Sequence, residues 1–144
     1  MKFGTELLRR SEKEAFGKLL GLEAVDVSPG RAVVRMHAGP NIGNIFGGIH
    51  GGALFSLIDE AFQLACNTHG TLAVALNVSI TYVAAPLQGA TLEATAEELH
   101  KTNRTASYFC RINEIESGKL IATAQALAYR TGKKIEELPS WSQE

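Results

Sequence analysis

Residues 51–68 constrain the fold of this chain more than any other segment, because their helical pattern is apolar on most sides. Outside a single stripe, every residue from 53 to 66 is apolar. The polar stripe recurs at helical spacing and consists of Ser56, Asp59, Glu60, Gln63 and Asn67. A helix with so wide an apolar arc has to be covered by other elements. We therefore predict a buried central helix that ends near His69 and Gly70.

The chain after residue 72 changes to the alternating pattern and turn residues of β-strands. In the last strand segment, one face carries Leu120, Ala122, Ala124, Ala126 and Ala128. Such a row of small side chains allows a helix to approach the sheet closely. The predicted strands cover residues 22–27, 31–37, 73–84, 91–100, 105–113 and 120–130. The order of elements predicts an α+β domain in which an antiparallel sheet wraps around the central helix.

Three segments are expected along the chain. Residues 1–21 should form an N-terminal helix, because apolar residues recur at helical spacing between positions 3 and 20. Residues 22–132 should form the main domain, and the polar residues 133–144 a poorly ordered tail. One helix cannot cover the whole sheet, and sheet edges need protection, so we expect a homodimer or homotetramer.

Charge and cysteine content disfavour several classes of protein. The formal net charge is −1 and there is no basic run, which disfavours binding to nucleic acid or anionic membranes. The two cysteines, Cys66 and Cys110, form no disulfide framework and are expected to pack in the core. The charged N-terminal residues do not fit a signal peptide, and no segment reaches transmembrane length. We therefore expect a cytoplasmic protein without membrane insertion.

The residues around the start of the central helix carry groups that acyl transfer requires. Asn44 and the run His50-Gly51-Gly52 precede the helix, and Asp59 lies on it little more than two turns in. Unpaired N–H groups at a helix start favour a developing oxyanion, and a carboxylate can attack or deprotonate. The combination predicts a site for acyl transfer.

Each of these residues also has an ordinary interpretation. Asp59 belongs to a stripe that would usually face solvent, although a carboxylate on a mostly buried helix must be paired, hydrogen-bonded or functional. His50 alone indicates a loop or helix-capping residue. Lys101 and Arg104 are either solvated loop charges or a phosphate contact. No histidines have zinc-ligand spacing and no glycines form a nucleotide-binding loop, so we predict no metal and no cofactor.

Taken together, these residues resemble the hotdog-fold acyl-CoA thioesterases, and most closely the phenylacetic acid degradation (PaaI) type. The resemblance rests on Asn44, on His50-Gly51-Gly52 that begins six residues later, and on Asp59 nine residues after the histidine. It spans roughly residues 20–132, through Ala61-Phe62, Ala65-Cys66-Asn67, Ser79-Ile80-Thr81-Tyr82 and residues 122–130. It implies a hotdog fold, subunits paired through their sheets, and active sites at the dimer interface.

The resemblance also implies a role for the matching positions. Asp59 would be the nucleophile or general base, and the backbone N–H of Gly51 from the neighbouring subunit would form the oxyanion hole. Asn44 and His50 would orient the thioester carbonyl or the attacking water and hold the loop. Some related thioesterases position this water with a Ser or Thr on the following strand, where Ala75 stands here. Further candidate substrate-binding residues are Gly52, Gln63, Asn77, Thr81, Lys101 and Arg104.

The leading hypothesis is hydrolysis of an acyl-CoA to a free acid and CoA. The alternative is a non-catalytic acyl-CoA binding module, which would bind CoA esters without releasing a thiol. A hotdog hydratase or dehydratase ranks last, because its usual Asp/His pair is not evident. The sequence leaves the acyl group open.

Overall fold

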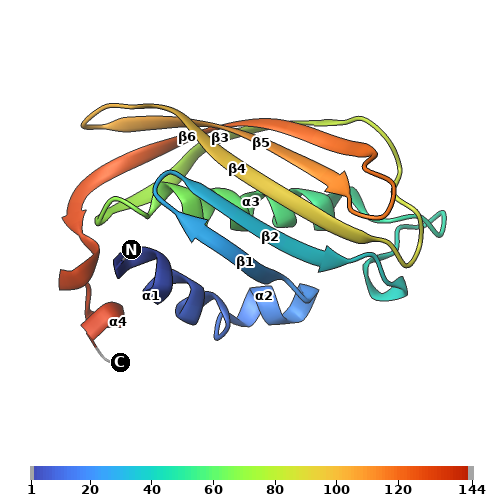
Figure 1. Ribbon diagram of the computed structural model, residues 1–144, viewed down its shortest axis with the longest axis horizontal. Helices are drawn as coiled ribbons and strands as arrows, with labels where there is room; N and C mark the ends of the chain where they lie inside the picture. The colour runs from blue at the N-terminus through green and yellow to red at the C-terminus, as the bar shows by residue number, and fades with distance from the viewer. Residues whose placement is uncertain (1, 143–144) are drawn as a thin grey trace.

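The computed structural model of the chain, which describes residues 2–142, confirms the predicted α+β architecture. One antiparallel sheet of six strands curves around the long helix α3 (Gly51–Cys66), as Figure 1 shows. The strands follow one another across the sheet in the order β1-β2-β4-β5-β6-β3. Their bounds are β1 Glu23–Ser28, β2 Arg31–His37, β3 Thr71–Tyr82, β4 Thr91–Lys101, β5 Thr105–Glu114 and β6 Leu120–Lys134.

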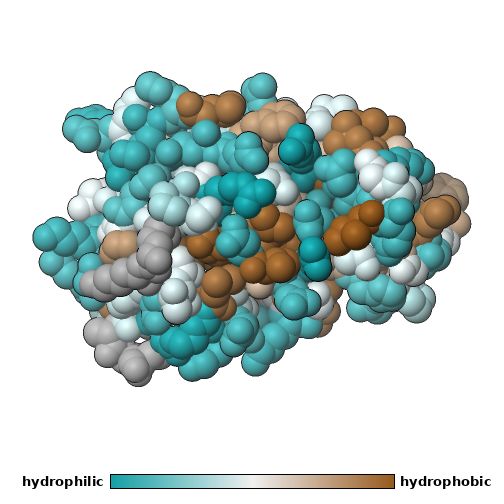
Figure 2. Space-filling view, in the orientation of Figure 1, coloured by the Kyte–Doolittle hydropathy of each residue, from teal (hydrophilic) through white to brown (hydrophobic). Residues whose placement is uncertain are grey.

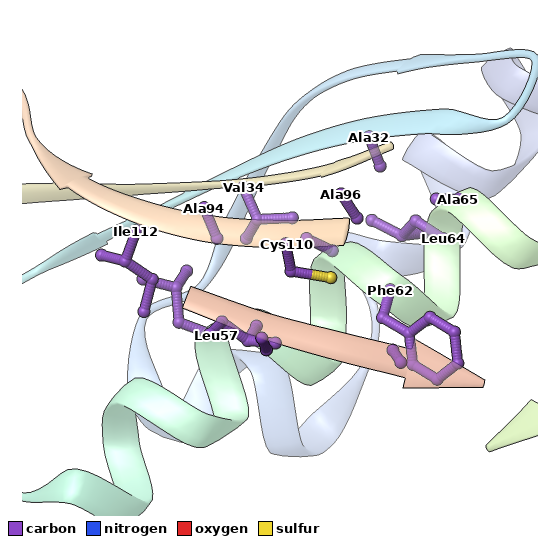
Figure 3. Packing of buried hydrophobic residues seen from close by; sticks show 14 of the residues in the cluster. Ala32, Val34, Leu57, Phe62, Leu64, Ala65, Ala94, Ala96, Cys110 and Ile112 are labelled. Atoms are coloured by element: carbon purple, nitrogen blue, oxygen red, sulfur yellow. The ribbon is translucent and has the colours of Figure 1, made fainter. Parts of the chain in front are cut away.

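On β4 and β6, much of the inner face of the sheet consists of small side chains, as the alanine row predicts for β6. Residues 122, 124, 126 and 128 of β6 are all 3% exposed or less. Ala94 and Ala96 on β4 add to this face, and Figure 3 shows Leu57 and Phe62 of α3 among the residues packed there. Because these alanine side chains are short, the larger α3 side chains fill the space opposite them.

Asn67 ends α3 slightly before the predicted stop at residues 69–70 and joins it to β3. Its side-chain amide donates to the carbonyl oxygens of Gln63 (2.8 Å) and Ala73 (3.2 Å). Its Oδ1 accepts the Ala73 N–H at 2.9 Å. The amide is buried and fully hydrogen-bonded, so it fixes the start of β3 against the end of the helix.

The single N-terminal helix expected over residues 3–20 is wrong. The structure has two helices, α1 (Lys2–Ser11) and α2 (Ala15–Leu20), separated by residues 12–14. Lys13 and Glu14 donate their N–H groups to the carbonyl oxygens three residues earlier, which tightens the chain into a turn. The three residues of the turn are all charged, so continuing the helix through them would bury no apolar surface.

The C-terminal segment is structured rather than poorly ordered over the described residues. Strand β6 continues to Lys134, and η2 (Ile135–Glu137) and α4 (Pro139–Ser142) follow. Ile135 is buried, and the Arg10 guanidinium lies 3.9 Å from the centre of the Trp141 ring. The segment therefore packs beside α1, as Figure 1 shows. Met1 and residues 143–144 of the expected N- and C-terminal segments lie outside the described residues.

Strand β3 forms one edge of the sheet and carries apolar side chains in the open. Val74 is 46% exposed and Leu76 57%, and the pairing with β6 is irregular between Ala75 and Asn77.

On the face shown in Figure 2, apolar surface gathers near the middle of the view among hydrophilic residues. No helix within residues 2–142 combines the length and the apolar character that crossing a membrane requires.

Candidate functional site

Asn44 organises the loop that leads into α3. Its Oδ1 accepts the backbone N–H groups of Phe46 (2.8 Å) and Gly48 (3.0 Å). Its own N–H donates to the carbonyl oxygen of Gly48 at 2.7 Å. These bonds close a turn over residues 44–48, so the Asn44 side chain holds the loop, which is one of the roles that the family resemblance implies for it.

His50 is the N-cap of α3. It has extended backbone angles (φ −67°, ψ 132°), and its Nδ1 accepts the N–H of Gly52 at 2.8 Å. Because Nδ1 is the acceptor, the neutral imidazole carries its proton on Nε2. The exposed ring therefore presents an N–H donor beside the helix start.

Gly51, the first residue of α3, presents a free backbone donor. Its N–H has no hydrogen-bond acceptor within residues 2–142, whereas the N–H of Gly52 is taken by His50. Its carbonyl oxygen accepts a hydrogen bond from the Tyr82 hydroxyl of β3 at 3.1 Å, which orients the peptide between Gly51 and Gly52. The free N–H lies at the positive end of the helix dipole, where an anion is favoured.

Asp59 lies on α3 in a sheltered position rather than on an open face. It is partly buried and lines a cavity of about 180 Å³ together with Ser56 and Phe16. Burial raises the pKa of the Asp59 carboxyl, and the nearby charge of Glu14 raises it further. A carboxylate with a raised pKa is a stronger base, which suits it for general-base or nucleophilic work.

Beside Asp59, two glutamates form a pair that local sequence does not reveal. The Gln63 amide donates to Glu14 at 2.8 Å and to Glu60 at 2.6 Å, so both carboxyl groups accept a hydrogen bond from the same side chain. Glu60 is 6% exposed. Burial raises its pKa well above the usual range, and Glu14 contributes through a hydrogen bond and its charge. The expectation that the polar stripe faces solvent is therefore correct for the exposed Gln63 and wrong for the buried Glu60.

The raised pKa of Glu60 predicts a pH-dependent stability. Folded Glu60 keeps its proton at pH values where the unfolded residue, near the ordinary glutamate pKa of 4.5, has lost it. The contribution of protonated Glu60 to the free energy of unfolding is thus complete below pH 4.5. It is lost as the pH rises, by at most about 1.4 kcal/mol per pH unit. We expect Glu60→Gln to flatten this fall, so that its melting temperature exceeds that of wild type at pH 8 and approaches it at pH 5.

Glu12→Gln is the matched control, because Glu12 is exposed in the turn between α1 and α2. Thermal unfolding of the three proteins across this pH range is the measurement. Equal pH slopes for wild type and Glu60→Gln would contradict the assignment.

The remaining candidate residues are dispersed in the single chain. Gly52 and Gln63 lie on α3, whereas Asn77 and Thr81 are exposed on the edge strand β3. Lys101 and Arg104 are exposed at the β4–β5 hairpin. None of the residues on β3 or the hairpin lines the cavities at Asp59 and His50.

Gly51 and Asp59 are also separated within one chain. They are eight residues apart on α3, which at 1.5 Å per residue is about 12 Å along the axis. An oxyanion donor and an attacking group each have to lie about 3 Å from one reacting carbonyl. The two residues of a single chain therefore do not meet at one carbonyl group.

Sequence reasoning assigned no role to three residues that the structure places at the site. Tyr82 belongs to the run that carries the family resemblance, and its contact with Gly51 gives that likeness a structural reason. Glu14 and Phe16 carry no local signal, because only the packing of the N-terminal segment brings them to α3.

The cysteines belong to the core, as predicted. Cys66 is 4% exposed and Cys110 0%. Burial raises the pKa of each thiol to about 12, so neither is a thiolate near neutral pH. Cysteine nucleophiles are thus excluded from the site.

Known proteins share both the sequence around this site and its fold. The family description of the thioesterase superfamily matches residues 46–121, which include Gly51 and Asp59. A putative esterase of Archaeoglobus fulgidus is 40% identical over 116 residues, covering 81% of this chain and 75% of that protein. The acyl-coenzyme A thioesterase PaaI of Escherichia coli is 36% identical over 124 residues, covering 86% of this chain and 88% of that protein.

Solved structures show the same fold. The E. coli PaaI protein from the phenylacetic acid degradation operon superposes with a TM-score of 0.83 and 34% identity, covering 88% of this chain and 91% of its own. A hypothetical thioesterase of Streptococcus pneumoniae, solved with coenzyme A, has a TM-score of 0.79 and 25% identity. That match covers 88% of this chain and 98% of the other.

Proposed function

This chain belongs to the thioesterase superfamily and has the hotdog fold of its PaaI-type members, and we propose that it hydrolyses an acyl-CoA thioester to a free acid and CoA. One observation carries the proposal. The helix start offers the Gly51 N–H as an unused donor, and the same helix offers Asp59 with a raised pKa. These are the oxyanion donor and the attacking group of acyl transfer.

Asp59 acts on the thioester carbonyl as general base or nucleophile. As general base, its carboxylate takes a proton from water while the water oxygen bonds to the carbonyl carbon. The tetrahedral intermediate then collapses, the C–S bond breaks, and the CoA sulfur leaves with its electron pair and gains a proton. As nucleophile, Asp59 would first displace the sulfur itself, and water would then hydrolyse the resulting anhydride.

The loop before α3 stabilises the charge that develops on the carbonyl oxygen. Gly51 donates its backbone N–H from the first position of α3, and Tyr82 holds the next peptide through the Gly51 carbonyl oxygen, so little reorganisation accompanies the reaction. The Nε2–H of His50 is a second donor that faces outward beside it. Asn44 keeps the turn closed and thereby positions both donors.

We further propose that two subunits complete each site. The separation of about 12 Å between Gly51 and Asp59 means that Asp59 serves the Gly51 of a neighbouring subunit. Strand β3 is a long edge strand with exposed Val74 and Leu76, the kind of edge that soluble proteins cover. Pairing of β3 with a second copy would cover it and extend the sheet across a two-fold axis.

Mixing two inactive variants tests this arrangement. In a mixed dimer of Asp59→Asn and Gly51→Pro chains, one of the two sites contains only intact groups. Random assembly from equal amounts should therefore restore about a quarter of wild-type activity, because half of the dimers are mixed. Co-refolded chains would be compared with each variant alone in a thiol-release assay. A mixture that stays as inactive as its components would place the complete site within one chain.

Lys101 and Arg104 remain proposed contacts for the CoA phosphates. Both are exposed, and Arg104 lines an open hollow with Tyr129 and Arg130, which adds a second guanidinium and an aromatic ring. Within this proposal residues 22–132 form the catalytic domain, and a cytoplasmic location remains a prediction from cysteine usage.

A thiol-release assay over a panel of acyl-CoA esters tests the function itself. We expect CoA thiol to appear with at least one ester, without added metal or cofactor. An acyl-CoA binding module gives the opposite result, namely saturable binding of the esters with no thiol released above the uncatalysed rate.

A further inference from the structure

Two cavities lie along the polar stripe of α3 and share two lining residues. One, of about 330 Å³, adjoins His50 and Gly52 at the helix start. The other, of about 180 Å³, adjoins Asp59. Phe16 and Ser56 line both cavities. A ligand group that extends along α3, either from His50 or from Asp59, therefore passes beside Phe16.

Helix α2, which carries Phe16, approaches α3 closely at Gly17. Gly17 is buried, and a Cβ at this position would lie 3.1 Å from a Glu14 oxygen and 3.2 Å from a Glu60 oxygen. Gln63 bridges the same two carboxyl groups. At the other end, Gly21 adopts a left-handed conformation (φ 70°) that ends the helix. Phe16 thus lies between two points of contact with α3, at Glu14 and at Gly17, and its side chain is 56% exposed.

The lining of the cavities selects for the chemistry of the occupant. The first cavity is walled largely by apolar side chains, with Leu20, Ile42 and Ala53 beside Phe16. The second carries the carboxyl groups of Glu14, Asp59 and Glu60. An apolar group gains by covering the exposed ring, whereas a carboxylate would be repelled by the charges of Glu14 and Asp59.

We propose that Phe16 is a specificity-determining residue that limits the length of an uncharged, apolar acyl group lying along α3. The inference rests on the proposed hydrolysis of an acyl-CoA and specifies the class of acyl group that the site accepts. A cavity of 330 Å³ lies at the lower end of the range of about 300–1,000 Å³ for small-molecule sites, which fits a short or medium acyl group. Phe16 precedes residues 46–121 of the superfamily match, so the N-terminal segment supplies this selectivity.

Phe16→Ala tests the limit, with Leu19→Ala as the matched control. Leu19 lies on the same helix and is 72% exposed, but it lines neither cavity. The assay measures kcat/KM for straight-chain acyl-CoA esters from butanoyl to hexadecanoyl. We expect Phe16→Ala to raise the preference for longer over shorter chains at least about 10-fold, as expected for a methylene gained in an apolar pocket. Leu19→Ala should keep the wild-type profile, and Phe16→Trp should shift it toward shorter chains.

A binding measurement separates this inference from the proposed function. S-alkyl-CoA thioethers of the same lengths lack the carbonyl and cannot be hydrolysed, so their Kd values report on the pocket alone. Absence of thiol release by wild type would overturn the proposed function, and the Kd series would still test Phe16. Unchanged chain-length profiles in kcat/KM and Kd for folded Phe16→Ala and Phe16→Trp would overturn the inference. A preference for adipoyl-CoA over hexanoyl-CoA would overturn its uncharged substrate class.

Discussion

Asp59→Asn should lower kcat/KM for acyl-CoA hydrolysis about 10²–10⁴-fold while leaving the protein folded. The amide has nearly the same shape as the carboxyl group, but it neither accepts a proton from water nor attacks the carbonyl. Because Asp59 is only partly buried and forms no ion pair with any residue from 2 to 142, the melting temperature should change little. Thiol release and thermal unfolding on the same preparations are the measurements.

The chain contains one other aspartate, Asp26, which provides the control. Asp26 lies on β1, makes an exposed ion pair with Arg31, and lines neither cavity of α3. Asp26→Asn should keep wild-type activity. If Asp59→Asn retained more than about a tenth of the activity, Asp59 would not be the base or nucleophile.

The pH profile gives a second signature of the same residue. Asp59 must be ionised to act, and burial raises its pKa above the ordinary aspartate value of 3.8. Wild-type kcat/KM should therefore fall on acidification at a pH above that value. The residual activity of Asp59→Asn should lack this acid limb.

Gly51→Pro should lower kcat/KM about 10²–10³-fold, the loss found when one oxyanion donor is removed. Proline has no N–H, and the first position of a helix is where it is best tolerated. His50, with φ −67° and ψ 132°, already has the extended conformation that a residue before proline favours. The substitution therefore removes the donor without breaking a hydrogen bond of the helix.

Gly51→Ala is the companion variant, because it adds a Cβ but keeps the N–H. That Cβ would lie 3.3 Å from the Tyr82 ring, which is 51% exposed and has room to move. We expect the kcat/KM of Gly51→Ala to stay within about tenfold of the wild-type value and to be much higher than that of Gly51→Pro. Equal losses in the two variants would attribute the effect to crowding at Tyr82 and remove Gly51 from the oxyanion hole.

Most of the fold could be predicted because its signals are local. The apolar arc of α3 and the alternation of the strands depend only on residues near one another in sequence. The break between α1 and α2 could not be predicted this way, since the charged residues 12–14 are compatible with a helical surface. The packing of Trp141 on Arg10 joins the two ends of the chain, so no local pattern predicts it.

The sequence indicated candidate site residues, which remain predictions, but not the hydrogen bonds that they make. Asn44, His50 and Gly51 are close in sequence and meet in one loop, as expected. Which glycine offers a free N–H depends on the ring of His50, which takes the donor of Gly52 and leaves that of Gly51. Such a choice is set by side-chain geometry, which residue spacing does not specify.

The sequence by itself determined the buried helix, the small-residue face that receives it, and the eight-residue interval from Gly51 to Asp59. The rise of a helix converts that interval into a distance of about 12 Å, and our proposal that a second subunit completes the site rests on this distance. Only the tertiary structure decided which residues surround the polar stripe of α3. Glu14 and Phe16 are remote from Asp59 along the chain, yet they close its cavity and remove water from the carboxyl groups. A pKa depends on that loss of water and on neighbouring charge, both of which are set by packing across the fold.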